Sequence, residues 1–115
     1  MKKSEIKIEL EMDENAVPER ITWHASDAGQ KGDVKASFLS VWDDQTQTAL
    51  RVDLWTKEMT VDEMKLFFYQ TLMTMADSFE KATGMNIESD EIRDFGTYFG
   101  RRVGLISQDE MNRNN

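Results

Sequence analysis

The chain has 115 residues, of which 39% are hydrophobic and 31% are charged, with a single proline and no cysteine. A chain of this length is expected to form one domain and to bury about two-thirds of its unfolded surface. The formal net charge of −8 disfavours nucleic acid and anionic membranes as partners. The lack of cysteine excludes disulfides, thiolate catalysis and cysteine-based metal centres, and it fits a reducing compartment.

The N-terminal segment predicts a strand that is buried on one face. Apolar and charged residues alternate from Glu5 to Met12, with Ile6, Ile8 and Leu10 on the apolar side. This alternation leaves no apolar run that resembles a secretion signal or that could span a bilayer. We therefore expect a cytoplasmic protein without direct membrane insertion.

Residues 20–25, RITWHA, predict a second strand, with Ile21 and Trp23 on one side and His24 on the other. The first two strands are expected to pair as a hairpin. Residues 26–33, SDAGQKGD, carry two glycines among polar residues and predict a loop.

Two further β-rich runs, VKASFLSVWD and TALRVDLWT, flank a short polar turn and predict a second hairpin. We expect a register that places Trp42 opposite Thr48. In that register the core face holds Phe38, Ser40, Trp42, Leu50, Val52 and Leu54. The other face is mixed and holds Leu39, Val41, Ala49, Arg51, Asp53 and Trp55, with Lys35 opposite Trp55 and within reach of a cation–π contact.

The hydrophobic period changes at Thr60 and predicts a long amphipathic helix that ends at Gly84. Its apolar stripe is spaced by three and four residues and consists of Val61, Met64, Phe68, Leu72, Met75 and Phe79. Thr60 and Glu63 predict a capping box at the start of this helix, and Met59 and Met64 predict a hydrophobic staple.

A second helix is expected to start at Ser89 as its N-cap and to stop at Gly104. Its apolar positions are Ile92, Phe95, Phe99 and Val103. Gly96 and Gly100 lie one turn apart, so they allow another backbone to approach closely. That neighbour is either the first helix or a partner.

These elements predict an α+β fold: a four-stranded antiparallel sheet, made of two hairpins, followed by two helices packed on one face of the sheet. We expect a single domain over residues 1–105. Residues 106–115 are polar and are expected to form a frayed tail.

No pattern for catalysis, metal binding or cofactor binding emerges from the chain. The single histidine, His24, is followed by Ser26 and Asp27, but neighbours along one strand and loop diverge and cannot form a triad. No zinc, calcium-loop or phosphate-loop spacing is present. We therefore expect no catalytic residues, no metal, no cofactor and no enzyme activity.

The mixed sheet face is the candidate protein-interaction face, because tryptophan and arginine on an uncovered sheet are typical interface anchors. It comprises Lys35, Leu39, Val41, Arg51, Asp53 and Trp55. A second copy or another protein could cover it. Methionines on the long helix, such as Met73 and Met75, could form a pliable groove, although core filling explains their spacing better.

The longest motifs resemble one known family. The motifs that carry the resemblance are DLWTKEMTVDEM and QTLMTMADSFEKAT, with VPERITW before them and IRDFGTYFG after them. Over about residues 4 to 100, the chain closely resembles the gliding motility-associated protein GldC family. The resemblance implies a small soluble cytoplasmic protein of gliding bacteria of the Bacteroidota type. It also implies that the protein assists a motility machinery whose companions include a lipoprotein and a secretion system. The resemblance identifies no catalytic residues.

The function expected from these observations is that of a non-enzymatic accessory protein of gliding motility that acts through protein–protein contacts. Its partners would belong to the gliding or secretion machinery, and a homo-oligomer is possible. The alternative is a binding protein for exported or motility components that resembles the secretion chaperone SecB, because an acidic four-stranded sheet with two helices has the same plan.

Overall fold

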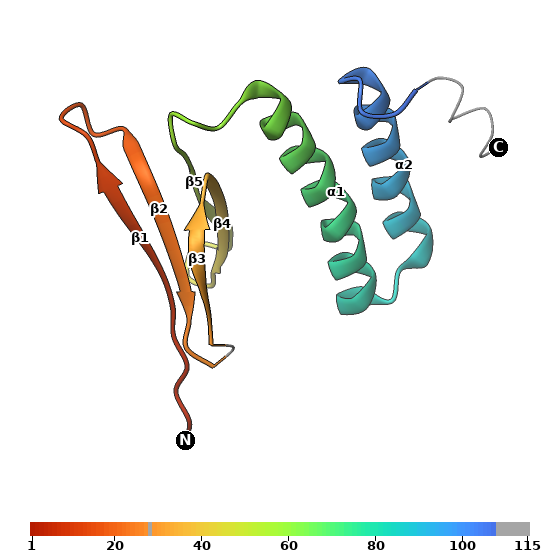
Figure 1. The fold of residues 1–115 in the computed structure, drawn as a ribbon. Coiled ribbons are helices and arrows are strands. Elements are labelled where there is room, and N and C mark those ends of the chain that lie inside the picture. The colour runs from red at the N-terminus through yellow and green to blue at the C-terminus, as the bar shows by residue number, and fades with distance from the viewer. Residues whose placement is uncertain (28, 108–115) are drawn as a thin grey trace. The chain divides into compact units, whose positions relative to one another are not determined.

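The computed structural model describes residues 1–27 and 29–107 and confirms the α+β class (Figure 1). It has five strands in two antiparallel sheets, so the expectation of four strands in one sheet is wrong in this detail. The chain forms two compact units, residues 1–59 and the part from Thr60 onward, and each is described by itself. The single domain, and the packing of the helices on the sheet, stay predictions.

The first sheet has the order β1-β2-β3, formed by β1 (Ile6–Met12), β2 (Pro18–Ala25) and β3 (Gln30–Val34). The predicted hairpin of β1 and β2 is confirmed, with Ile8 opposite Trp23 and Leu10 opposite Ile21. Strand alternation therefore places these apolar residues on one face. Ile21 lies at the centre of that face and is 0% exposed.

The predicted loop over residues 26–33 is partly wrong, because Gln30–Asp33 belong to β3. Gln30 and Gly32 have weak strand propensity, but polar contacts with β2 override it. Asp33 accepts a hydrogen bond from Arg20 Nε at 3.1 Å, and the Arg20 Nη2 pairs with the same oxygen at 3.1 Å. Gly29 turns the chain with a φ of 61°, which glycine adopts readily.

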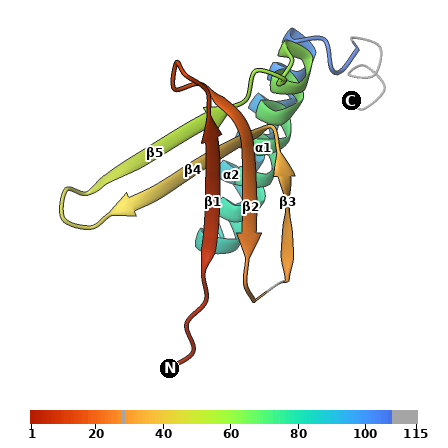
Figure 2. The ribbon, with the colours of Figure 1, turned by 60° about the vertical axis from the view of Figure 1, so that its left-hand side comes forward.

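The second sheet is the hairpin of β4 (Ala36–Asp43) and β5 (Thr48–Trp55). Figure 2 shows this hairpin extending away from the three-stranded sheet. The hairpin closes with Asp43 opposite Thr48, and the Gln47 amide donates to the Asp43 carbonyl at 2.9 Å. Asp43 also accepts hydrogen bonds from the Gln45 amide and the Thr46 hydroxyl, and these fix the turn.

The first helix, α1, spans Val61–Thr83, as its hydrophobic period predicts. The predicted capping box is present: the Glu63 amide donates to Thr60 Oγ1 at 3.0 Å, and the Thr60 amide donates to Glu63 Oε1 at 3.1 Å. Gly84 closes the helix with a φ of 73°, in the left-handed conformation. The hydrophobic staple of Met59 and Met64 stays a prediction.

The second helix, α2, spans Asn86–Arg102, so the expected N-cap at Ser89 is wrong. The chain returns to helix directly after Gly84, one turn earlier than expected. Ser89 is buried, and its hydroxyl donates to the Met85 carbonyl at 2.7 Å. A serine bonded back to the residue four positions earlier lies inside a helix and does not cap it. Gly104, with a φ of 89°, follows the end of α2 as predicted.

No helix in the described parts of the chain is long and apolar enough to cross a membrane. The C-terminal tail predicted for residues 106–115 falls largely outside the described residues, since positions 108–115 belong to neither described range.

Candidate functional site

The register of the β4–β5 hairpin differs by one residue from the expected one. Asp43, not Trp42, lies opposite Thr48, and Ala36, not Lys35, lies opposite Trp55. A slip of one residue moves every side chain of one strand to the other face of the sheet. The predicted interaction face is therefore divided: Leu39 and Val41 lie on one side of the hairpin, and Arg51, Asp53 and Trp55 lie on the other.

We call the side with the tryptophans the aromatic–charged face, and it consists of Phe38, Trp42, Arg51, Asp53 and Trp55. The guanidinium of Arg51 lies over the Phe38 ring, 5.6 Å from its centroid, and donates to Asp53 Oδ1 at 3.0 Å. Trp42 is 62% exposed and Trp55 is 53% exposed. Two large indoles thus flank an arginine whose position is held by an aromatic ring and a carboxylate.

The opposite side of the hairpin is the aliphatic face, formed by Leu39, Val41, Leu50 and Val52. Leu39 lies opposite Val52 and Val41 lies opposite Leu50, so the four side chains form two cross-strand pairs. Each of them is about half exposed. The expected register, which differs by one residue, places these four residues on two different faces.

A hollow of about 240 Å³ lies beside Trp55. Ala16 and Val17, from the turn between β1 and β2, and Pro18, the first residue of β2, line it together with Asp53–Trp55. The hollow therefore extends the aromatic–charged face at its Trp55 end. The signal for it in the sequence is weak, because turn residues do not predict which strand they will lie beside.

Asp13 organises the turn between β1 and β2. Its Oδ1 accepts hydrogen bonds from the amides of Asn15 at 2.8 Å and Val17 at 2.9 Å, and its Oδ2 pairs with the Lys57 ammonium. The bond with Lys57, followed by that with the Val17 amide, lowers the pKa of Asp13 below 3.8. This cluster joins the turn to the segment after β5, so we assign it a structural role.

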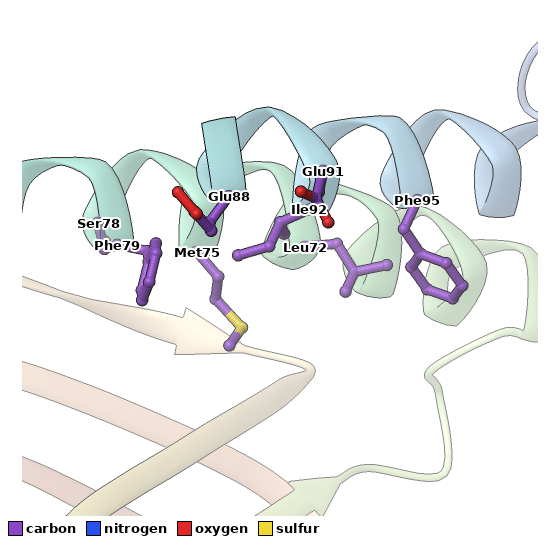
Figure 3. A pocket seen from close by; sticks show the side chains of 8 residues that line it. All are labelled: Leu72, Met75, Ser78, Phe79, Glu88, Glu91, Ile92 and Phe95. Carbon is purple, nitrogen blue, oxygen red and sulfur yellow. The ribbon is translucent and has the colours of Figure 1, made fainter. Parts of the chain in front are cut away.

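The helical unit carries an apolar groove of about 760 Å³ between α1 and α2. Figure 3 shows its lining, with Glu88 and Glu91 on the α2 side. The apolar lining residues come from the two predicted stripes and are Leu72, Met75, Phe79, Ile92 and Phe95. The stripes of both helices therefore lie side by side on one surface.

The helices also contact each other through small residues. A Cβ added to Gly96 would lie 2.6 Å from Met73 Sδ, and one added to Gly100 would lie 3.0 Å from the Tyr69 ring. The close neighbour of both glycines is thus α1. Ala76 of α1 is fully buried.

One arginine connects the two helices electrostatically. Arg93 of α2 donates to Asp77 Oδ1 at 2.8 Å and Glu80 Oε1 at 3.2 Å, both on α1, and to Asp90 Oδ1 at 2.8 Å on its own helix. The hydrogen bond that Arg93 donates to Asp77, followed by those to Asp90 and Glu80, raises the pKa of Arg93. Like Asp13, Arg93 has a structural explanation.

The described residues offer no group of three or more His, Cys, Asp or Glu side chains that could hold a metal ion. His24 lies exposed on β2, between Lys7 of β1 and Lys31 of β3 in the register. Its neighbours are therefore ammonium groups, which do not orient an imidazole as a carboxylate does in a triad.

A family model described as gliding motility-associated protein GldC-like matches residues 18–105. The chain belongs to this GldC-like family. Membership associates the protein with gliding motility, in agreement with the resemblance of the tryptophan-containing motifs. Among curated proteins and solved structures, none matches the chain.

The part of the chain that matches the GldC-like family begins at Pro18, the first residue of β2, and reaches Leu105, just after α2. It therefore includes the whole β4–β5 hairpin and both helices, whereas β1 lies outside it. The aromatic–charged face and the helical groove are both built from residues that the family model covers.

Proposed function

We propose that this GldC-like protein is a non-enzymatic accessory protein of gliding motility that acts in the cytoplasm by contact with a protein of the gliding or secretion machinery. The aromatic–charged face is the observation that supports the proposal. Tryptophan and arginine dominate the energetics of protein interfaces, because they combine large apolar area with directional polar groups. Here two indoles, each more than half exposed, flank an arginine held in place.

The geometry of Arg51 adds to this argument. An exposed arginine loses side-chain entropy when a partner immobilises it. In this protein the Phe38 ring and the Asp53 carboxylate already restrict the Arg51 side chain. Binding through Arg51 therefore costs less entropy than binding through a freely rotating arginine.

The test is complementation of gliding in cells that lack the protein. Trp55→Ala and Arg51→Glu are expected to abolish the recovery of gliding while the protein stays folded and abundant. Arg20→Glu is the matched control, because Arg20 is also an exposed arginine paired with an aspartate, but on the first sheet. Normal gliding with both Trp55→Ala and Arg51→Glu would exclude this face as the contact site.

The second candidate function is that of a chaperone resembling SecB. The apolar groove of the helical unit favours it, because an unfolded segment could lay apolar side chains along Leu72, Ile92 and Phe95. A chaperone would suppress the aggregation of several unrelated unfolded proteins, whereas an accessory protein would bind one defined partner. Aggregation assays with two unrelated clients distinguish the two functions.

A further inference from the structure

The outer edge of β4 lacks the features that protect the other edge strands. In the described sheets β4 pairs only with β5. Exposed strand edges normally carry charges, prolines or bulges that prevent pairing with another chain. The outer strand β1 has Lys7, Glu9 and a break in register after Glu11, but β4 has no charged residue from Ala36 to Trp42.

The backbone hydrogen bonds show which groups of β4 face outward. The Thr56 amide donates to the Lys35 carbonyl at 2.8 Å, so Lys35 directs its backbone toward β5. In an antiparallel pair this direction alternates from residue to residue. The backbone groups of Ala36, Ser40 and Trp42 therefore point away from β5, toward the edge of β4 that has no partner strand in the described sheets.

We propose that two copies of this chain pair through β4, antiparallel and centred on Leu39, to form a four-stranded sheet β5-β4-β4-β5. In this register, Leu39 of one copy lies opposite Leu39 of the other. Even-numbered residues pair with even-numbered ones, so the aliphatic faces of the two hairpins join on one side and the aromatic–charged faces on the other.

The charges at the two ends of β4 favour a second copy as the occupant of this edge. Lys35 precedes β4 and Asp43 ends it, and both lie four residues from Leu39. Antiparallel pairing centred on Leu39 places Lys35 of each copy opposite Asp43 of the other, and opposite charges across a strand pair are favourable. The segment KASFLSVWD is thus complementary to itself, although the chain as a whole carries a net charge of −8.

The edge of β5 is the less accessible one. Ala16–Pro18 line the hollow beside Asp53–Trp55, so the turn between β1 and β2 lies next to that half of β5. A two-stranded hairpin is also marginally stable by itself, and a sheet of four strands is more stable. Pairing through β4 uses the backbone edge of the hairpin and not its two faces, so this inference goes beyond the proposed function and does not depend on it.

A register-specific crosslink tests the proposal, because the natural chain has no cysteine. Leu39→Cys would place two cysteines in a pair that is not hydrogen-bonded, with Cα atoms about 4.5 Å apart, a separation that a disulfide spans. Val52→Cys is the matched control: it lies on the same face, but its two copies would be about 14 Å apart across three strand spacings. We expect Leu39→Cys to form a covalent dimer at least about tenfold faster under mild oxidation. Equal rates would overturn the proposal.

Light scattering of the natural chain provides the second readout. We expect a mass of twice 13.4 kDa that falls to 13.4 kDa on dilution. Ser40→Pro removes an outward amide without removing a bond to β5, so the dissociation constant should rise by about tenfold or more. Ala49→Pro makes the same change on the β5 edge and should leave the dimer intact.

If Ser40→Pro fails to fold by circular dichroism, Lys35→Glu replaces it, because this change sets a carboxylate opposite Asp43. A natural chain that is monomeric at all concentrations, or a folded Ser40→Pro or Lys35→Glu that dimerises normally, would overturn the proposal.

Discussion

Gly100→Ala sets helix propensity against the close approach of the two helices. In an open helix, alanine is more stable than glycine by about 1 kcal/mol. At Gly100 the new Cβ would lie 3.0 Å from two ring atoms of Tyr69 and 3.0 Å from Ile106 Cδ1. The Ile106 methyl can rotate away, but the ring is rigid. Overpacking of this kind costs about 1–3 kcal/mol, so we expect the net free energy of unfolding to fall by up to about 2 kcal/mol.

A double-mutant cycle separates the two effects. Chemical denaturation followed by circular dichroism would compare Gly100→Ala in the natural background and in a Tyr69→Ala background. Without the ring, only the propensity gain remains, so Gly100→Ala should stabilise the Tyr69→Ala protein by about 1 kcal/mol. The sign of the effect therefore reverses between the two backgrounds. The same sign in both would refute the assignment of Gly100 as the point of closest contact with Tyr69.

Three further changes test other parts of the structure by the same denaturation measurement. Ile21→Ala should lower the free energy of unfolding by about 2–5 kcal/mol, since Ile21 is the fully buried large side chain of the first sheet; a loss below about 1 kcal/mol would contradict its central place. Thr60→Ala should lower the free energy of unfolding by about 1 kcal/mol because the capping box is lost, and Thr60→Ser should retain most of this stability. Asp13 has a folded pKa below its unfolded value, so its contribution is present above pH 3.8 and is lost as the pH falls through the folded pKa. The natural protein should therefore have a higher free energy of unfolding than Asp13→Asn at pH 7, and this difference should disappear in acid. A difference that does not depend on pH would refute the role of the Lys57 pair.

The elements with strong periodic or capping signals were predictable from sequence. The alternation from Ile6 to Met12, the three-and-four spacing after Thr60 and the glycine at position 84 each predict one local conformation, and the structure has it. The predicted burial of one face of β1 is wrong, because Ile6, Leu10 and Met12 are exposed. The class α+β follows from them. Family membership also followed from contiguous motifs, because the residues that carry it are adjacent in the chain.

The candidate face could not be placed from the sequence because it depended on a turn with no distinctive residue. Gln47 adopts a φ of 56° at the end of the turn, a conformation that glycine or asparagine would have signalled and glutamine does not. The register shifts by one residue as a result, and that shift alone separates Leu39 and Val41 from Arg51. The predicted N-cap at Ser89 is wrong for a similar reason, since a serine that caps a helix and one that bonds back inside it look alike in sequence.

The helical unit shows why a correct apolar stripe did not reveal the contact between the helices. Periodicity identifies which side chains are apolar, but the surface on which two helices meet is decided by how closely their backbones can approach. Here Gly96, Gly100 and Ala76 allow the closest approach, and Arg93 reinforces it through the two carboxylates that it binds on α1. The larger apolar residues of both stripes are consequently left together along the groove that Leu72, Met75, Phe79, Ile92 and Phe95 line. The small residues thus determine how the helices pair, and the large ones determine which surface the pair presents.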